Sequence, residues 1–179
     1  NAYVDSVPML VITGSPHTYL RGKGLLQEIE RVQDANFARM LEPVVKRYWT
    51  PTSPAQLPSI MRRAFNLMMT GRRGPVLIDL PMDVGAEAAD VDIPEPDKRG
   101  PSARACADAA AIDEAAALLA KAKRPLIVVG GGVRAAGAHA ELRDVAETLG
   151  AAVITTLMGK GSFPEDHELS AWLGGSKGT

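Results

Sequence analysis

The chain has 179 residues, of which 46% are hydrophobic and only 4% aromatic, and its formal net charge is −1. The length suits one large domain, or two domains that are each only partly present. The near-neutral charge gives no reason to expect a nucleic acid or an acidic membrane as partner, and no apolar run approaches the roughly 20 residues that span a bilayer. A single cysteine excludes an intramolecular disulfide and cysteine-rich zinc sites, and it favours a reducing, intracellular compartment.

The first half of the sequence alternates between predicted strands and predicted helices. Strands are expected at residues 8–13, 43–49 and 76–80, which are short and largely apolar runs, and helices at residues 25–40 and 54–70, where apolar residues recur at helical spacing. Ser53 is the expected N-cap of the second helix, because a proline follows it, and Gly71 is its expected C-cap. Asp79 lies within the third strand, and we interpret it as a structural hydrogen-bond acceptor.

The second half repeats this alternation after a change of composition. Residues 84–110 contain three prolines, many charges and little periodicity, which indicates a linker. A helix at 112–122, a strand that ends in a glycine turn at 130–132, a helix at 138–149 and a strand at 151–156 are then predicted. Asp113 and Glu114 are expected near the start of the first of these helices, where they complement its dipole. Residues 157–179 are predicted to be a loop.

This order predicts an α/β fold made of two incomplete parallel-sheet units, each of the doubly wound, Rossmann-like type, joined by a linker. The expected boundaries are residues 1–84 for the first unit, 85–110 for the linker and 111–179 for the second unit. Ligands bind at the carboxyl ends of the strands in such sheets. The loops that follow each strand are therefore the places to look for a site.

The glycine turn is the clearest local motif. Gly130, Gly131 and Gly132 begin a G-x-G-x-x-A pattern between a strand and a helix, where the absence of Cβ atoms lets a pyrophosphate approach the backbone. The acidic residue expected about 20 positions later is missing, which disfavours a nicotinamide cofactor. The alternative is a tight turn that only packs the helix onto the sheet. The nearby sequence GKGS at residues 159–162 does not fit the phosphate-loop pattern.

Other candidate residues carry weaker signals. The three histidines, His17, His139 and His167, are scattered without metal-ligand spacing, so no metal ligand is predicted. His139 and His167 are expected to be exposed to solvent, whereas His17 lies just after the first strand, where a site is expected. Spacing alone makes Gln27 part of an ordinary polar helix face. It makes Arg72 a solvated residue at a helix C-terminus.

Several segments together carry a resemblance to a known family. The sequences GRRGPVLIDLPMDV and TTLMGKGSFPEDH, supported by LLQEIE, VVKRYW and RPLIVVGGG, fall in an order that resembles thiamine-diphosphate-dependent enzymes of the acetolactate synthase type. The resemblance covers nearly the whole chain. It implies that the chain corresponds to the second half of a pyrimidine-binding domain, a linker and the first half of a central domain. The family's activating glutamate and the motif that holds Mg²⁺ and the diphosphate would then lie outside this sequence, so the chain alone is expected to be inactive.

The resemblance also implies roles for particular residues. Gln27 matches the family's active-site glutamine, and Lys46 falls near a lysine of the substrate channel, so both are expected to be catalytic. Arg72 matches an arginine that contacts FAD in flavin-containing members. The remaining expected cofactor contacts are Gly130, Gly131, Gly132, Thr156, Leu157, Gly175, Gly178 and Thr179. Two positions depart from acetolactate synthases, with Leu26 in place of phenylalanine and Lys177 in place of histidine.

The implied function is carboligation or lysis of 2-oxo acids, most simply decarboxylation of pyruvate and transfer of the two-carbon unit to a second 2-oxo acid. Thiamine diphosphate and Mg²⁺ are the implied cofactors, with FAD as an optional third. Competing hypotheses are another family member, such as a 2-hydroxyacyl-CoA lyase or a 2-oxoacid decarboxylase, and a non-catalytic nucleotide-binding module. A cytoplasmic homodimer or homotetramer is expected, as is a part in branched-chain amino acid biosynthesis.

Overall fold

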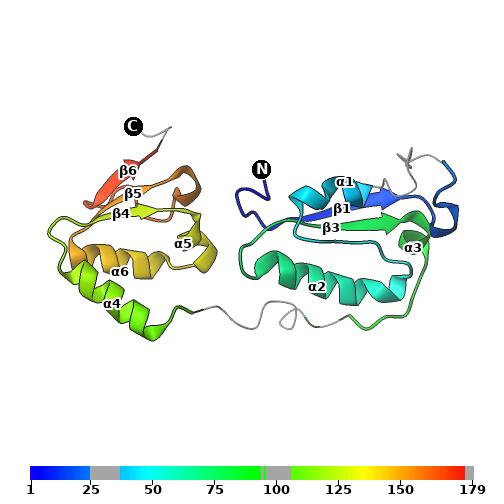
Figure 1. Cartoon of the computed structure of the whole chain (residues 1–179), viewed down its shortest axis with the longest axis horizontal. Coiled ribbons are helices and arrows are strands. Elements are labelled where there is room, and N and C mark those ends of the chain that lie inside the picture. Colours follow the sequence, from blue (N-terminus) through cyan, green and yellow to red (C-terminus); the bar gives the residue numbers. More distant parts are fainter. Residues whose placement is uncertain (25–36, 94, 96–105, 176–179) are drawn as a thin grey trace. The chain divides into compact units, whose positions relative to one another are not determined.

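The structure is a computed structural model, and it describes residues 1–24, 37–93, 95 and 106–175. The chain divides into two compact units, Asn1–Ala105 and Cys106–Thr179 (Figure 1). Each unit contains one three-stranded sheet, and every strand pair in both sheets is parallel. The predicted α/β class with two parallel-sheet units is therefore confirmed.

The first unit contains a sheet with strand order β1-β3-β2. The strands are β1 (Leu10–Ser15), β2 (Tyr48–Trp49) and β3 (Val76–Pro81), so the first two predicted strands begin later than expected. The helices are α1 (Phe37–Leu41), α2 (Leu57–Met69) and α3 (Met82–Ala86), and the 3₁₀ turns are η1 (Thr18–Leu20), η2 (Glu42–Val44) and η3 (Pro54–Gln56). The rest of the helix predicted at 25–40 lies outside the described residues.

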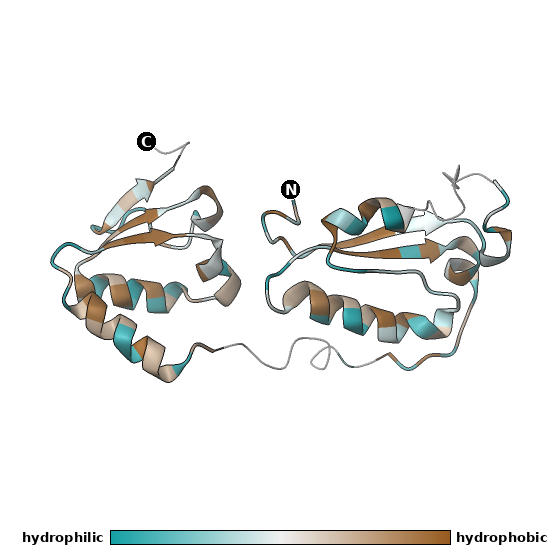
Figure 2. Cartoon of the chain, viewed as in Figure 1, coloured by the Kyte–Doolittle hydropathy of each residue, from teal (hydrophilic) through white to brown (hydrophobic). Residues whose placement is uncertain are grey.

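The core of this unit forms around β3, the central strand. Val76 and Ile78 are buried against Ile60 and other residues of α2, whereas Leu77 is buried on the other face with Ala38 of α1. A strand that is covered on both faces needs a continuous apolar run rather than alternation. This explains why β3 is apolar at every position except Asp79, and Figure 2 shows the strand as mainly hydrophobic beside helices of mixed character.

The ends of α2 were predicted in part. Gly71 follows the helix with a φ of 62°, the left-handed conformation that glycine adopts without steric cost. Ser53 precedes Pro54 as predicted, but its side chain makes no capping hydrogen bond. Instead the side chain of Gln56 accepts the backbone N–H of Thr52 and donates to its hydroxyl. The chain therefore enters the helix through a 3₁₀ turn rather than a serine cap.

The second unit contains a sheet with strand order β4-β5-β6. Its elements are α4 (Ala109–Ala120), β4 (Leu126–Val129), α5 (Gly131–Ala136), α6 (His139–Leu149), β5 (Ala152–Thr155), the 3₁₀ turn η5 (Leu157–Gly159) and β6 (Ser170–Leu173). The buried core consists of Val129, Ala146, Val153 and Phe163. Because Ala146 belongs to α6, this helix covers one face of the sheet.

Predictions for two elements of this unit, the last strand and the first helix, were wrong. Residues 157–179 are not a loop throughout, because β6 pairs in parallel with β5, although its register is irregular and Trp172 has a φ of 62°. Helix α4 also begins three residues earlier than predicted. Asp108 caps it by accepting the backbone N–H groups of Ala110 and Ala111, so the first turn contains no acidic residue.

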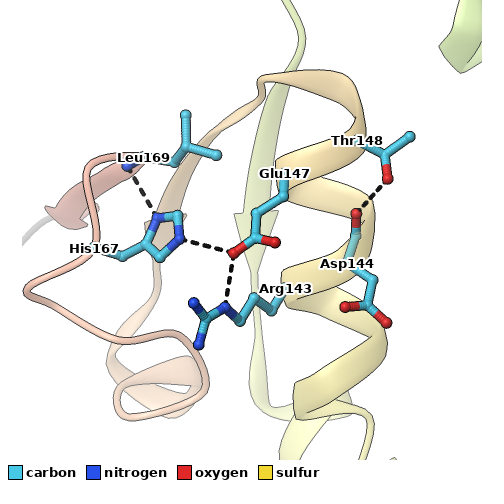
Figure 3. Close-up of polar contacts among 6 residues, drawn as sticks. All are labelled: Arg143, Asp144, Glu147, Thr148, His167 and Leu169. Carbon is cyan, nitrogen blue, oxygen red and sulfur yellow. Dashed lines mark hydrogen bonds and ion pairs between the residues drawn. The ribbon is translucent and has the colours of Figure 1, made fainter.

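His167 was predicted to be exposed, but its side chain is only 13% exposed. Its Nδ1 accepts the backbone N–H of Leu169, so the hydrogen lies on Nε2, which donates to Glu147 at 3.1 Å (Figure 3). Arg143 donates to the same carboxylate oxygen at 2.8 Å. The ring also packs edge-on against Phe163, with centroids 5.0 Å apart. His167 thus attaches the segment before β6 to α6.

This attachment predicts a pH dependence of stability. The hydrogen bonds from Arg143 and His167 lower the pKa of Glu147. A carboxylate whose pKa is depressed on folding stabilises the fold above its unfolded pKa and loses that contribution as the pH falls through the folded pKa. We expect Glu147→Gln to lower the melting temperature at neutral pH, and the difference from wild type to shrink below about pH 4.

The measurement is thermal unfolding of both proteins across this pH range. Glu168→Gln is the matched control, because Glu168 is an exposed carboxylate next to His167 in the same segment. Its difference from wild type should stay small at every pH. A Glu147→Gln difference that is the same at about pH 3 and pH 7, to within error, would contradict the assignment.

Candidate functional site

The carboxyl edge of the first sheet is held by buried polar contacts between β1 and β3. Thr13 and Asp79 are register partners, and the Thr13 hydroxyl donates to the Asp79 carboxylate at 2.8 Å. Asp79 is 1% exposed, so its predicted role as a structural acceptor is confirmed. Ser15, at the end of β1, is 5% exposed, and its hydroxyl has no hydrogen-bond partner among the residues that the structure describes. The Ser15 hydroxyl is therefore a buried polar group at this edge that still has the capacity to form a hydrogen bond.

The loops that leave β1 and β3 are joined at this edge by Asp83. Both oxygens of its carboxylate accept the backbone N–H of Thr18 at 3.1 Å, and Oδ2 also accepts the Thr18 hydroxyl at 2.5 Å. The hydrogen bonds from Thr18 lower the pKa of Asp83. The carboxylate is therefore ionised throughout the neutral range. His17 lies in the same loop, with its ring 5.2 Å from that of Tyr19.

In the second unit the three glycines follow β4 directly, but Gly131 and Gly132 are the first residues of α5 rather than a turn. The name glycine turn is kept for residues 130–132. A Cβ atom added at Gly130 or Gly132 would meet no atom within 4 Å, so the backbone is open on this side. Gly131 is different, since a Cβ there would touch Met158 at 3.4 Å. The turn thus combines two glycines that leave room for a ligand with one that packs against the neighbouring loop.

The loop after β5 crosses this turn at very short range. A Cβ atom added at Gly159 would lie 2.1 Å from the carbonyl oxygen of Val129. Thr156 holds the crossing in place, because its side chain and carbonyl oxygen accept the Gly159 N–H and its own N–H donates to Val129. Leu157, by contrast, is 67% exposed. Thr156 therefore has a structural contact, and Leu157 is accessible.

The other predicted cofactor contacts lie at the same edge or outside the described residues. Gly175 has a φ of 103°, and a Cβ atom added there would meet nothing within 4 Å. The neighbouring Gly174, which directly follows β6, donates its N–H to the carbonyl oxygen of Thr155 at the end of β5. Gly178 and Thr179 lie outside the described residues, as does Gln27 of the first unit. The structure thus brings the second unit's predicted contacts in the described chain to one edge of its sheet.

Lys46 and Arg72 lie at the opposite, amino edge of the first sheet. The Lys46 ammonium donates to the carbonyl oxygens of Leu67, Thr70 and Arg72, where α2 ends. Partial burial lowers the pKa of Lys46. The Arg72 guanidinium donates to the Ser6 hydroxyl at 2.8 Å and to the carbonyl oxygen of Val4 at 2.7 Å. Both cations therefore have structural partners within their own unit.

The other features of the described residues do not add a further candidate site for a cofactor or a metal ion. A cavity of about 430 Å³ lies between the outer side of α2 and residues 87–93, and its lining is mainly apolar. Within the described ranges, no three histidine, cysteine, aspartate or glutamate side chains are grouped so that they would hold a metal ion. Among the helices that the structure describes, none has the length and apolar character needed to cross a membrane.

Comparison with known proteins shows which enzymes the chain is similar to. Residues 112–179 match the family model for the central domain of thiamine pyrophosphate enzymes. The chain is a homologue of thiamine pyrophosphate-dependent enzymes. It is 43% identical over its whole length to an acetolactate synthase large subunit from Corynebacterium glutamicum, of which it covers 28%. It is 39% identical over 98% of its length to a glyoxylate carboligase from Escherichia coli O157:H7, of which it covers 28%.

A solved structure gives the same result for this thiamine pyrophosphate enzyme homologue. The X-ray structure of a thiamin diphosphate-dependent enzyme from Mycobacterium smegmatis matches 96% of the chain with a TM-score of 0.69 and 28% identity. The chain covers 32% of that protein, so it spans about a third or less of the proteins it resembles. The predicted family resemblance is confirmed.

Sequence reasoning missed two features of these edges. It gave no role to Thr18 and Asp83, which are 65 positions apart and meet only in the folded unit. It also placed Gly159 within a predicted loop at residues 157–179, although the backbone of β4 passes very close to this glycine. The available signal was that Asp83 stands two residues after a strand that ends in proline.

Proposed function

We propose that the full-length protein is a thiamine-diphosphate-dependent carboligase or lyase that acts on 2-oxo acids. The most specific form of the proposal is an acetolactate synthase activity, in which pyruvate is decarboxylated and its two-carbon unit is transferred to a second 2-oxo acid. The observation that carries it is identity of about 40% to acetolactate synthases over essentially the entire chain. The parallel α/β units with loops at their carboxyl edges support it, since such edges bind ligands.

The domain assignment is part of this proposal. Residues 1–84 would belong to the pyrimidine-binding domain and residues 111–179 to the central domain, with a linker between them. The match of residues 112–179 to the central-domain family supports the second boundary. Thiamine diphosphate supplies the electron sink that stabilises a carbanion when a 2-oxo acid loses carbon dioxide. The groups that bind Mg²⁺ and the diphosphate would lie outside this chain, which contributes one wall of the site.

The residue roles follow from the same proposal. Gln27 would contact cofactor and substrate from the segment after β1. The substrate-channel role that the resemblance implies for Lys46 would require its ammonium to leave the three carbonyl oxygens at the amino edge. FAD, where present, would lie along Gly130 and Gly132, whose open backbone leaves room for a pyrophosphate. Leu157 and the segment that ends at Thr179 would complete its contacts within the second unit. The residues of the glycine turn thus fit a dinucleotide.

Glyoxylate carboligase is the second candidate that an observation favours, because one relative of that name matches nearly as well as the synthases. A 2-hydroxyacyl-CoA lyase and a 2-oxoacid decarboxylase are further candidates from the same scaffold, and a non-catalytic nucleotide-binding module is the candidate without this chemistry. The proposal includes a cytoplasmic protein that assembles as a homodimer or homotetramer.

The test is an assay of the purified full-length protein against pyruvate, 2-oxobutyrate and glyoxylate, with and without thiamine diphosphate and Mg²⁺. We expect carbon dioxide release and a carboligation product from pyruvate only when the cofactors are present. We also expect Gln27→Ala to lower kcat/KM by about tenfold or more, which corresponds to about 1.4 kcal/mol of transition-state stabilisation. The matched control is Gln56→Ala, since the Gln56 side chain contacts Thr52 at the surface.

Each outcome of this assay is informative. A product from glyoxylate alone would replace the synthase with a carboligase of the second type. No turnover of any 2-oxo acid, with tight binding of an adenine nucleotide, would overturn the enzyme proposal in favour of a binding module. A yellow colour of the purified protein, measured as visible absorbance, would decide separately whether flavin is bound.

A further inference from the structure

The described residues contain one polar contact at the carboxyl edge that no proposed role explains. Asp83 is the second residue of α3, and Thr18 is the first residue of η1, in the loop after the neighbouring strand. Three hydrogen bonds join them, and both residues are half-buried. Such multiple contacts to an ionised carboxylate are among the stronger hydrogen bonds in proteins. Asp83 therefore connects the loops that follow β1 and β3.

The contact with Asp83 supplies the N-terminal capping hydrogen bond that the loop after β1 does not form with its own side chains. His17 occupies the N-cap position of η1, but its side chain makes no capping hydrogen bond. Asp83 accepts the first N–H of this turn from outside the loop, and its negative charge suits the N-terminal end of the turn. The direction in which residues 18–24 leave the sheet thus depends on Asp83, which lies in α3 after the neighbouring strand β3.

The last residue of β1 does not supply this acceptor. The Ser15 hydroxyl is buried and has no hydrogen-bond partner among the described residues, so the Thr18 N–H depends on Asp83. On the strand side, the contact between Thr13 and Asp79 fixes β1 to β3 two residues before the strands end. Asp83 extends this connection beyond the strands into the loops.

We propose that Asp83 is a positioning residue for the reaction: it acts through Thr18 to hold the loop after β1, with His17 and Tyr19, at the carboxyl edge where the 2-oxo acid binds. The inference rests on the proposed function, because it assigns the loop to that substrate site. Tyr19 is 65% exposed and its ring contacts that of His17, so the loop presents these two side chains together. Asp83 itself does not touch the substrate.

The test compares variants of the full-length holoenzyme. We expect Asp83→Ala to lower kcat/KM for pyruvate by about tenfold to a hundredfold, since small displacements of a site cost that much. Thr18→Val should lower it in the same direction, and Thr18→Ser, which keeps the hydroxyl, should restore most of the activity. The double variant Asp83→Ala with Thr18→Val should lose no more than Asp83→Ala alone, because the two residues act as one unit.

A matched control separates positioning from stability. Asp108→Ala removes a carboxylate that caps α4 in the other unit through two backbone N–H groups. It should lower the melting temperature by an amount similar to Asp83→Ala, but leave kcat and KM unchanged. Trypsin supplies a readout that is independent of activity, because Arg21 and Lys23 are exposed in the same loop. Cleavage after these residues should accelerate several-fold in Asp83→Ala and stay unchanged in Asp108→Ala.

Failure of this inference is distinguishable from failure of the proposed function. If wild-type protein turns over no 2-oxo acid, the proposed function fails, and with it the assignment of the loop to a substrate site. If wild type is active but Asp83→Ala has wild-type kcat and KM, the positioning role is overturned. Equal trypsin cleavage in Asp83→Ala and wild type would show that Asp83 does not hold the loop at all.

Discussion

Replacing Gly159 with alanine is expected to destabilise the second unit by about 3 kcal/mol or more, because no side chain fits at this position. The added Cβ would lie 2.1 Å from the carbonyl oxygen of Val129 and 2.8 Å from its carbonyl carbon. Both atoms belong to the backbone at the end of β4, so neither can rotate away as a side chain would. Relief requires η5 to move from the glycine turn, which would break the hydrogen bonds between Thr156 and its neighbours.

Gly132→Ala is the matched control for this prediction. A Cβ atom at Gly132 meets nothing within 4 Å, and alanine is the better helix former within α5. We therefore expect little change or a slight gain in stability. Hydrogen exchange of residues 126–129 and 152–155 in the full-length protein reports on this unit directly. Unchanged protection of these strands in Gly159→Ala would show that the backbones do not cross so closely.

Much of the fold could be predicted because local signals agreed with the final structure. The central strand β3 is apolar except at Asp79, follows the turn at residues 71–74 and ends at Pro81, and it is buried on both faces as that pattern requires. Gly71 and Gly150 both adopt positive φ after helices, where glycine is favoured. The end of β4 was likewise predicted, because three consecutive glycines follow it, but helix α5 begins at the second of these glycines and was not predicted.

The wrong predictions concern elements whose own sequence carries a weak or ambiguous signal. Strand β6 has the sequence SAWL, which is short and has no clear period, and it is defined by its hydrogen bonds to β5 rather than by its own residues. The start of α4 was missed because Ala109 and Ala110 were interpreted as part of the linker, although alanine and an aspartate cap favour a helix there.

Site residues are harder to predict than elements for a related reason. Asp83 and Thr18 carry no motif, and their contact exists only because β1 and β3 are neighbours in the sheet. His167 is covered by Phe163 and Glu147, and the second of these lies on a helix 20 positions earlier. Family resemblance supplied candidate roles for Gln27 and the glycine turn, but the contacts of Lys46 and Arg72 required coordinates.

Lys46→Met is the second substitution with a large expected effect, about 1 to 2 kcal/mol of lost stability. The ammonium donates to three carbonyl oxygens, at distances of 2.5 Å to Leu67, 2.9 Å to Thr70 and 2.8 Å to Arg72. The last carbonyl groups of a helix have no partner within the helix, so a cation placed there satisfies them and complements the dipole. Methionine keeps much of the aliphatic stem, which packs against Gly74, but donates no hydrogen bond.

The matched control is Lys160→Met, which removes a lysine of the second unit whose ion pair in the described structure is with Glu165 at 3.4 Å. Both of these side chains are about half exposed, and exposed pairs contribute little, so a change within about 0.5 kcal/mol is expected. Thermal or denaturant unfolding of the full-length protein gives both values.

The same variant separates two roles for Lys46. A lysine that only closes the end of α2 should affect stability and leave kcat/KM of the folded enzyme near the wild-type value. A lysine that also lines the substrate channel should lower kcat/KM in Lys46→Met well beyond any loss of folded protein, and Lys46→Arg should restore charge without restoring the three contacts, because the guanidinium is planar and larger. Loss of activity at wild-type stability would show that the three carbonyl contacts do not describe the working enzyme, since breaking them must cost folding free energy.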